Sequence, residues 1–350
     1  MDLSPTDIQR ELAGTACRWL AERWPASYLT ELAAQAGSET GYDRGDWSAL
    51  AGQGWLDDGL GVVELGLLAV ESGYALQPTP WLVTMAVRPL YQAAGVSPPG
   101  PATLADGEAH GSGGPLGNWP DGACGGGLDG TVAALDADTA VVVPVCTRAG
   151  TLLAEVQLAD HGVTVTRPEG LDLWRRPAII RMDGAPARVL MLSSAAADPL
   201  AAARDRRDAL LSCEATGVAR RALDMAVSHA RQRRQFGRPI GSYQAVGHAL
   251  ADSYAGLELA RSLSYRALCV LAEGAAPDVR AEALATAAEA SSQAAVTACE
   301  TAIQVLGGMG VTWEYPLHLW YRRALWHRAA RSGPADPLSM VGDLILGPAG

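Results

Sequence analysis

Apolar residues recur at helical spacing through the first hundred residues of the chain. From Ile8 to Leu20 they fall at every fourth position, just after a Ser-Pro-Thr-Asp segment that is typical of a helix start. Trp24-Pro25 ends this first pattern. Asp46 precedes further apolar positions and is a candidate N-cap, and the run from Val62 to Tyr74 predicts a largely apolar helix. We therefore expect residues 1–98 to form a helical domain.

The pattern changes between about residues 99 and 200. Glycine and proline become frequent, and short β-like runs are separated by turn residues. These runs are Ala140 to Val145, Leu152 to Leu158, Val163 to Thr166 and Ala178 to Met182. Residues 99–200 are therefore expected to form a small central β domain.

Long helical patterns return after residue 200. They run from near Asp205 to Arg233, from after Pro239 to about Glu273, and from Pro277 to Leu306. Their length and their content of alanine and leucine favour a bundle of antiparallel helices over residues 201–350. The sequence thus predicts an α+β fold, with an N-terminal helical domain, a small central β domain and a C-terminal helical bundle.

Composition narrows the class of protein without locating a site. The 350 residues are 49% hydrophobic, enough for a sizeable core, and their net charge is −11. An acidic chain is a poor candidate for nucleic-acid binding. The cysteines and histidines show no metal-binding spacing. We find no basic and apolar leader and no apolar run of the roughly 18 residues that a membrane span needs, so we expect a cytoplasmic protein.

The most distinctive segment, Arg231 to His248, ends one predicted helix and opens the next. Four arginines fall within its first eight positions, beside glycine and proline. Guanidinium groups at a helix break form a ready anion-binding site. The alternative is solvated charge at a helix C-terminus, where cations are favoured in any case.

A second segment, Gln304 to Arg323, contains three glycines at the end of a predicted helix. Gly307 and Gly308 would let a ligand approach the backbone closely. The side-chain amide of Gln304, one turn earlier, can hydrogen-bond to a nucleotide. An ordinary glycine C-cap explains the same glycines without a ligand, so this segment alone is a weak signal.

Taken together, the two segments resemble the C-terminal bundle of acyl-CoA dehydrogenases. That family carries an Arg-x-x-Phe-Gly-x-x-Ile motif with a later glutamine, and a Gln-x-x-Gly-Gly-x-Gly motif with a later acidic residue, proline and arginine. The matching positions here are Arg233, Phe236, Gly237, Ile240, Gln244, Gln304, Gly307, Gly308, Gly310, Glu314, Pro316 and Arg322. The resemblance extends over the whole chain, including its order of helical, β and helical parts.

The resemblance implies an FAD-dependent enzyme that removes hydrogens from Cα and Cβ of an acyl-CoA thioester. In the family a glutamate takes the α-proton, and a hydride leaves Cβ for the flavin. The resemblance also implies five residues that contact the pyrophosphate and adenine half of the FAD of a neighbouring subunit. They are Arg233, Phe236, Gln304, Gly307 and Gly308.

The family's catalytic glutamate has no counterpart at either of its usual positions. Ungapped counting from the two motifs places Arg331 at one position and Arg207 at the other. A guanidinium group stays protonated at any working pH and cannot act as a general base. Asp205, Asp208 and Glu214 are the nearest carboxylates and remain possible bases, although Asp205 and Asp208 also suit the start of a helix.

The predicted β domain also lacks the family's usual flavin-facing segments, and residues 106–112 and 131–134 stand in their place. A chain that keeps the contacts reaching across to a neighbour, yet lacks its own base, resembles the shortened subunits of actinobacterial heterotetrameric acyl-CoA dehydrogenases. Those α2β2 enzymes act on steroid-CoA side chains. The resemblance implies a homologous partner subunit, a bulky acyl-CoA substrate, and a role in lipid β-oxidation or steroid degradation.

Two other interpretations stay open. A self-sufficient homomeric acyl-CoA dehydrogenase would use Asp208 or Glu214 as its base. A non-enzymatic scaffold subunit would keep the fold and bind no flavin. Elsewhere, Asp172 and Arg175-Arg176 are predicted to form an ion-paired surface beside a turn, and Trp320 is predicted to lie in the core, with a partner-facing position as the alternative.

Overall fold

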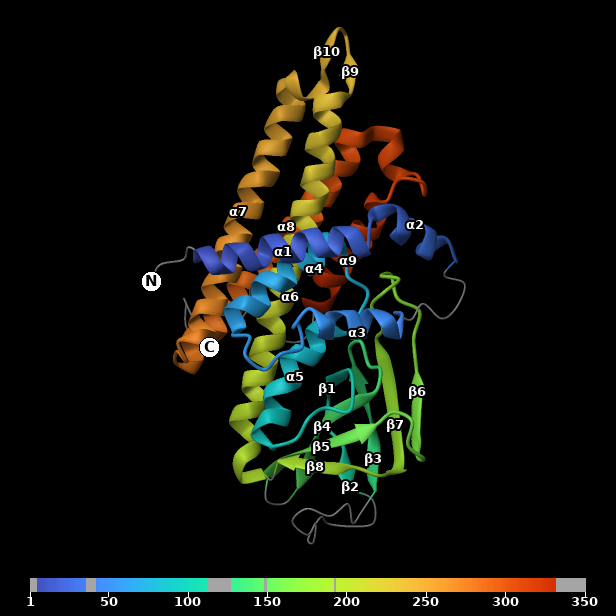
Figure 1. The fold of residues 1–350 in the computed structure, drawn as a ribbon, viewed down its shortest axis with the longest axis vertical. Helices are drawn as coiled ribbons and strands as arrows, with labels where there is room; N and C mark the ends of the chain where they lie inside the picture. Colours follow the sequence, from blue (N-terminus) through green and yellow to red (C-terminus); the bar gives the residue numbers. More distant parts are fainter. Residues whose placement is uncertain (1–4, 36–41, 112–126, 148–149, 192, 332–350) are drawn as a thin grey trace, which may run out of the picture.

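The computed structural model describes residues 5–35, 42–111, 127–147, 150–191 and 193–331. Helices open the chain, a curled β-sheet occupies its middle, and long helices close it (Figure 1). This order confirms the predicted fold class. The domain boundaries placed near residues 98 and 200 remain predictions.

Five helices form the N-terminal part. They are α1 (Asp7–Arg23), α2 (Ala26–Gln35), α3 (Arg44–Gly52), α4 (Val62–Ala75) and α5 (Trp81–Ala93). A capping box starts α1, because Thr6 Oγ1 accepts a hydrogen bond from the Gln9 backbone at 3.2 Å while Gln9 Oε1 accepts one from the Thr6 backbone at 3.0 Å. The helix start predicted from the sequence is therefore confirmed.

The N-cap of α3 is Asp43, and the prediction of Asp46 was wrong. Asp43 Oδ1 accepts a hydrogen bond from the Gly45 backbone at 2.8 Å. Asp46 lies in the first turn, where it is buried and pairs with the Arg23 guanidinium of α1 at 2.6 Å. Either aspartate could serve as an N-cap by residue type. The sequence alone does not show that Asp46 is instead paired with Arg23 of α1.

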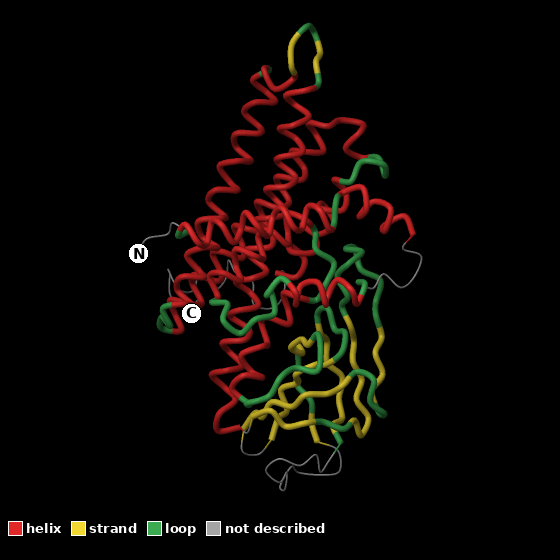
Figure 2. Tube along the Cα trace, in the orientation of Figure 1, coloured by secondary structure: helices red, strands yellow, loops and turns green. Residues whose placement is uncertain are grey.

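An eight-stranded sheet follows the helices. Its strands are β1 (Ala102–Asp106), β2 (His110–Gly111), β3 (Leu128–Ala134), β4 (Ala140–Thr147), β5 (Gly150–Gln157), β6 (Val163–Thr166), β7 (Ala178–Ala185) and β8 (Arg188–Met191). The strand order is β6-β7-β3-β1-β4-β5-β8, with β2 beside β3. Among the described strands, β1 and β4 pair in parallel and the other pairs are antiparallel. Figure 2 shows the strands of this sheet gathered in the lower part of the molecule, beside the lower ends of the helices.

The four strands predicted from the sequence correspond to β4, β5, β6 and β7. The other strands of the sheet were not predicted, and the reasons for β1 and β3 are physical. Four of the five residues of β1 are buried, so this strand shows no alternation of polar and apolar positions. In β3, Gly130 takes a φ of 143° and the register with β7 shifts beside it. Because glycine and alanine have low β-propensity, the sequence of this strand shows no clear strand pattern.

The C-terminal part is built from long helices joined by short turns. Its elements are α6 (Ser193–Gln232), β9 (Arg234–Gln235), β10 (Arg238–Pro239), the 3-10 turn η1 (Ile240–Ser242), α7 (Gln244–Ala272), α8 (Pro277–Leu306), the 3-10 turn η2 (Gly307–Val311) and α9 (Leu317–Arg331). The bounds of α8 agree with the prediction. α6 begins well before the predicted Asp205, and it runs through Pro199 because Ala196, Leu200 and Ala203 pack against the sheet.

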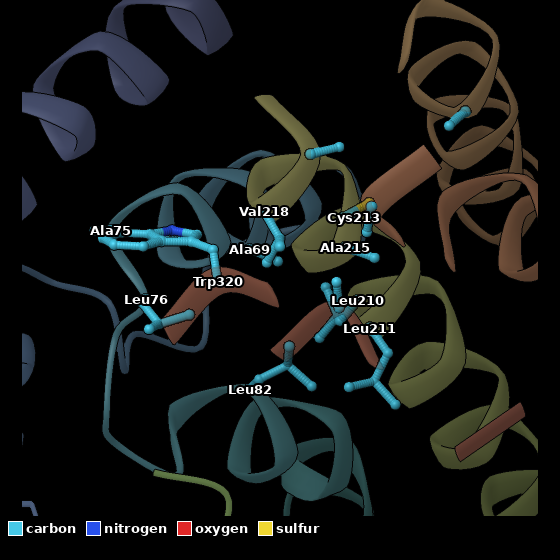
Figure 3. Close-up of a cluster of buried hydrophobic side chains, with 14 of the residues drawn as sticks. Ala69, Ala75, Leu76, Leu82, Leu210, Leu211, Cys213, Ala215, Val218 and Trp320 are labelled. Carbon is cyan, nitrogen blue, oxygen red and sulfur yellow. The ribbon is translucent and has the colours of Figure 1, made fainter. Parts of the chain in front are cut away.

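The helices α4 and α6 cross so closely that only glycine fits at the crossing. A Cβ atom on Gly217 would overlap the carbonyl oxygen of Val70, and one on Gly73 would overlap the carbonyl oxygen of Glu214. Figure 3 shows the apolar side chains gathered around this region, with Trp320 beside Ala75. Trp320 is 1% exposed, so its predicted core position is confirmed.

One helical stretch, Pro277–Val311, is long and apolar enough to cross a membrane by length and composition, with a hydropathy of 1.3. It is not a continuous apolar run of the roughly 18 residues that a membrane span needs, because polar residues such as Glu289 and Glu300 interrupt it. Its alanine content is what raises the average hydropathy. A helix that packs inside a bundle passes the same test, and α8 packs against α6, α7 and α9, so this stretch is weak evidence for a membrane.

We predict that Gly217→Ala destabilises the fold, because the added methyl group forces α4 and α6 apart. Overpacking of this kind costs about 1–3 kcal/mol, and sometimes more. Urea unfolding monitored by circular dichroism measures the change.

The matched control for this substitution is Gly256→Ala in α7, where a Cβ atom meets no atom within 4 Å. This change should stabilise the helix by roughly 0.5–1 kcal/mol. Equal effects of the two substitutions would contradict the close crossing.

Candidate functional site

The arginine-rich segment forms an exposed hairpin at the end of the molecule farthest from the sheet (Figure 1). It joins α6 to α7 through the short strands β9 and β10. The backbone N–H of Ile240 donates to the Arg233 carbonyl oxygen at 2.8 Å, and the Tyr243 hydroxyl donates to the Gln235 carbonyl oxygen at 3.1 Å. These bonds fix the hairpin on the two helices that carry it.

Phe236 occupies the turn of this hairpin and projects into solvent. Its side chain is 93% exposed and its φ is 50°, in the left-handed region that a bulky residue rarely adopts. The following Gly237, with a φ of 83°, completes the turn. Phe236 meets the Tyr243 ring edge-on, with the ring centroids 6.5 Å apart. An exposed, strained aromatic residue of this kind is suited to contact a ligand or another chain.

The four arginines of the hairpin are exposed, and none forms an ion pair with a carboxylate among the described residues. They are Arg231, Arg233, Arg234 and Arg238. Arg238 lies over the Tyr243 ring at 4.0 Å, and Arg234 donates to the Gly237 carbonyl oxygen at 3.3 Å. The positive charge of Arg233 also lowers the pKa of His229, after the larger effect of burial. The hairpin is therefore a concentrated positive surface with no internal counter-charge in the described chain.

The second motif lies at the upper end of α8. Gln304 is exposed on the last turn, and Gly307 ends the helix with a φ of 61°. A Cβ atom on Gly307 or Gly308 would meet nothing within 4 Å, so packing inside this chain does not require glycine there. Gly310 differs, because a Cβ atom there would lie 2.9 Å from the Ile303 carbonyl oxygen. The bare backbone at 307 and 308 is thus open to an external group.

Both motifs lie toward the same end of the helical bundle (Figure 1). The hairpin extends beyond the end of α8, so the two motifs border one region at this end of the chain. Such an arrangement suits a long anionic ligand that lies across the bundle end, and not a small ligand enclosed by it.

The two positions that ungapped counting predicts for the family's base have different surroundings. Arg207, on α6, pairs with Asp106 at the end of β1 at 2.8 Å and with Asp208 at 3.3 Å. Burial opposes its charge, but Asp208 and Asp106 together raise the pKa of Arg207 above its ordinary value. Arg331 is the last residue of α9, and the chain beyond it lies outside the described residues.

Glu214 lies inside a buried cluster of charged side chains, not at an accessible site. Its carboxylate pairs with the guanidinium groups of Arg175 and Arg323, the latter at 2.7 Å, and lies 3.0 Å from His327 Nε2. Burial alone would raise the pKa of Glu214, but the two guanidinium groups hold it well below its usual range. A carboxylate that is enclosed and stabilised in this way is a poor proton acceptor.

The same cluster overturns the predicted surface position of Asp172 and Arg175. Asp172 is 3% exposed and pairs with Arg323, while Arg175 is 6% exposed and donates to Asp136 at 2.5 Å. The prediction failed because a turn rich in charge usually faces solvent, whereas here α6 and α9 bring opposite charges onto it. The sequence signal was Glu214, a lone carboxylate within a strongly apolar stretch of helix.

Protein-family comparison agrees with the geometry of the bundle. Residues 205–335 match the family model described as acyl-CoA dehydrogenase, C-terminal domain. The C-terminal bundle of this chain is therefore an acyl-CoA dehydrogenase C-terminal domain.

Curated relatives add to this match. IpdE2 of Mycobacterium tuberculosis, an acyl-CoA dehydrogenase, is 39% identical over 140 residues, which are 39% of this chain and 42% of that protein. IpdE2 of Mycolicibacterium smegmatis is 31% identical over 172 residues, which are 49% of this chain and 52% of that protein. The chain thus spans about half the length of these relatives.

Solved structures extend the likeness to the whole chain. A chain of the ChsE4-ChsE5 complex from Mycobacterium tuberculosis is 26% identical, with a TM-score of 0.83 and 100% coverage of both chains. A chain of a Tcur3481-Tcur3483 steroid ACAD variant is 25% identical, with a TM-score of 0.82 and coverage of 97% and 98%. These findings confirm the fold and the resemblance to the acyl-CoA dehydrogenase family.

We predict that Arg323→Met destabilises the protein strongly. The substitution leaves Asp172 and Glu214 buried without a shared cation, and breaking a buried pair in this way costs about 3–5 kcal/mol. Chemical unfolding measures the loss. As a control, Arg261→Met removes an exposed cation of α7 and should change the free energy of unfolding by less than about 0.5 kcal/mol.

A further prediction concerns acid. Burial lowers the pKa of His327 from 6.5 to about 4. Between these two pH values, the imidazole is protonated in the unfolded chain and neutral in the folded protein. The resulting stability is fully present above pH 6.5 and is lost as the pH falls toward about 4. Replacing His327 by glutamine removes this contribution, so unfolding free energies of the variant should fall less steeply over that window. Parallel curves for the two proteins would contradict the assignment.

Proposed function

We propose that this chain is a subunit of an FAD-dependent acyl-CoA dehydrogenase and works beside a homologous subunit that supplies the catalytic glutamate. Its contribution is a set of contacts to the pyrophosphate and adenine half of the partner's FAD. The contacting residues are Arg233, Phe236, Gln304, Gly307 and Gly308. The reaction is α,β-dehydrogenation of an acyl-CoA, in the cytoplasm.

The observation that carries this proposal is the unbalanced positive charge of the hairpin. Guanidinium groups bind phosphate through paired hydrogen bonds, and those of Arg233 and Arg234 form no ion pair with a described carboxylate. The exposed ring of Phe236 and the open backbone at Gly307 and Gly308 fit the flat and extended parts of a dinucleotide. The residues present are therefore compatible with the outer half of FAD.

In this proposal the chain has the binding role, and the partner carries out the proton transfer. FAD, when bound, supplies the acceptor for the hydride that leaves Cβ of the substrate. Arg207 stays protonated between Asp106 and Asp208 and cannot take the α-proton. Glu214 is held as a carboxylate inside the buried cluster. Under this proposal, the partner subunit presents the base to Cα of the acyl group.

For the substrate we propose a bulky acyl-CoA with a ring-bearing side chain, such as a steroid-CoA. Support comes from the likeness to chains of the ChsE4-ChsE5 complex and the Tcur3481-Tcur3483 steroid ACAD. By analogy with such enzymes, a subunit that does not hold a flavin of its own leaves room for a larger acyl group at the shared site. We propose the same α2β2 assembly for this chain.

One competing function rests on a specific observation. The side chain of Asp208 is 40% exposed, so a self-sufficient homomeric enzyme could use it as the base that Glu214 cannot provide. That enzyme would hold one flavin per chain and act without a partner. Its neighbour Arg207 disfavours this role, because the Asp208 carboxylate already pairs with that guanidinium at 3.3 Å.

The decisive experiment measures the flavin-to-protein ratio and the acyl-CoA dehydrogenation rate in two preparations. The first is the chain purified alone, and the second is the chain co-expressed with a glutamate-bearing homologue from its own genome. We expect the first to be colourless and inactive and the second to be yellow and active, with about one FAD per pair of chains. A flavinated, active chain alone would favour Asp208 as the base, and a colourless complex would indicate a scaffold.

We predict that Arg233→Met in the complex weakens FAD binding by about ten- to a hundredfold, the equivalent of one charge-assisted phosphate contact of about 1.5–3 kcal/mol. Phe236→Ala should weaken it as well. Flavin fluorescence during dilution measures the release of FAD. Arg261→Met removes an equally exposed arginine from α7 and should leave FAD retention unchanged. Full retention of FAD in Arg233→Met would contradict the proposed contact.

A further inference from the structure

A small pocket of about 180 Å³ lies away from the hairpin, where α1 and the start of α2 meet α4, α6 and α9. Ala21 and Pro25 line it and are exposed, so they form its mouth. Trp24, Ala75 and Trp320 line it and are buried, so they form an apolar interior. No part of the proposed function uses this pocket.

One wall of the pocket carries a cation without a counter-charge. The guanidinium of Arg221 lies between two aromatic rings, 5.1 Å from the Tyr74 centroid and 5.4 Å from the Trp320 centroid. Its Nη1 donates to the Tyr74 hydroxyl at 3.3 Å, and its Nε is enclosed without a hydrogen-bond partner among the described residues. No described carboxylate lies within ion-pair distance of it.

The neighbouring Arg220, in contrast, has a carboxylate partner. Arg220 donates to both carboxylate oxygens of Glu71, at 3.0 and 2.5 Å, so the acidic group of the pocket is already satisfied. The Tyr74 hydroxyl donates to the exposed Asp224 at 3.0 Å, which orients its oxygen to accept from Arg221. The uncompensated charge that borders the pocket is therefore that of Arg221.

An arginine held between two rings is already ordered, so a ligand that binds it loses little further side-chain entropy. A carboxylate is the group that pairs best with a guanidinium. The rest of the lining favours a compact apolar body attached to that carboxylate. The volume equals about six water molecules at about 30 Å³ each, well below the pockets of drug-sized ligands.

We propose that this pocket binds a small apolar monocarboxylate, with the carboxylate on Arg221 and the apolar body against Trp24 and Trp320. None of the residues proposed to contact FAD lines this pocket, so the binding proposed here does not rest on the proposed function.

The test uses benzoate as the probe and benzamide as its neutral counterpart of the same shape. Isothermal titration of the full chain should show saturable binding of benzoate, with benzamide at least about tenfold weaker, because a charge-assisted pair is worth about 1.5–3 kcal/mol. Benzoate should also slow alkylation of Cys17, which lines the pocket, and leave the rate at Cys269 in α7 unchanged.

Three variants locate the binding. Arg221→Met should weaken benzoate by about tenfold or more, and Arg261→Met, at an exposed position of α7, should leave its affinity unchanged. Because Arg221 also packs between two rings, Ala21→Phe provides a second variant, which fills the exposed mouth without touching the core. Absence of benzoate binding, equal binding of benzamide, or full binding in both Arg221→Met and Ala21→Phe would overturn the proposal.

Discussion

The buried charged cluster around Glu214 is the constraint on which the rest of the arrangement depends. It joins four separate parts of the chain: the β3–β4 connection through Asp136, the β6–β7 connection through Asp172 and Arg175, α6 through Glu214, and α9 through Arg323. Each carboxylate is desolvated and acceptable only with its cations in place. The cluster thus forces the loops of the sheet and the two helices into one geometry.

The second constraint is the close crossing of α4 and α6. Because Gly73 and Gly217 let the two backbones approach, α6 can run as one helix from the edge of the sheet to the hairpin. One rigid helix therefore carries Arg207 beside the sheet, Glu214 in the cluster and Arg231 at the exposed tip. Inside the chain, Arg175 and Arg323 pair with buried carboxylates. The arginines of the hairpin form no ion pair with a described carboxylate and can bind an external anion.

The sequence predicted the order of helices and sheet because amphipathic patterns are long and local. It predicted the break between the two helices at the hairpin because glycine, proline and clustered arginine are typical of an exposed turn. It failed at Asp46, Asp172 and Arg175, whose burial is decided by side chains far along the chain. The sequence did not predict a role for Arg221 for the same reason, since its two aromatic neighbours come from α4 and α9.

Arg207 occupies a position that ungapped counting aligns with the family's base, and in this chain it is a structural group. A glutamate at this position would face Asp106 and Asp208, and the repulsion of three carboxylates would raise its pKa and push α6 from the end of β1. With arginine there, both aspartates gain a cation, and the contact between helix and sheet is stabilised. A glutamate introduced at this position would therefore break the contact between helix and sheet. In the geometry of this chain, Arg207 anchors α6 to the sheet, which suits the proposed role of a subunit specialised for binding.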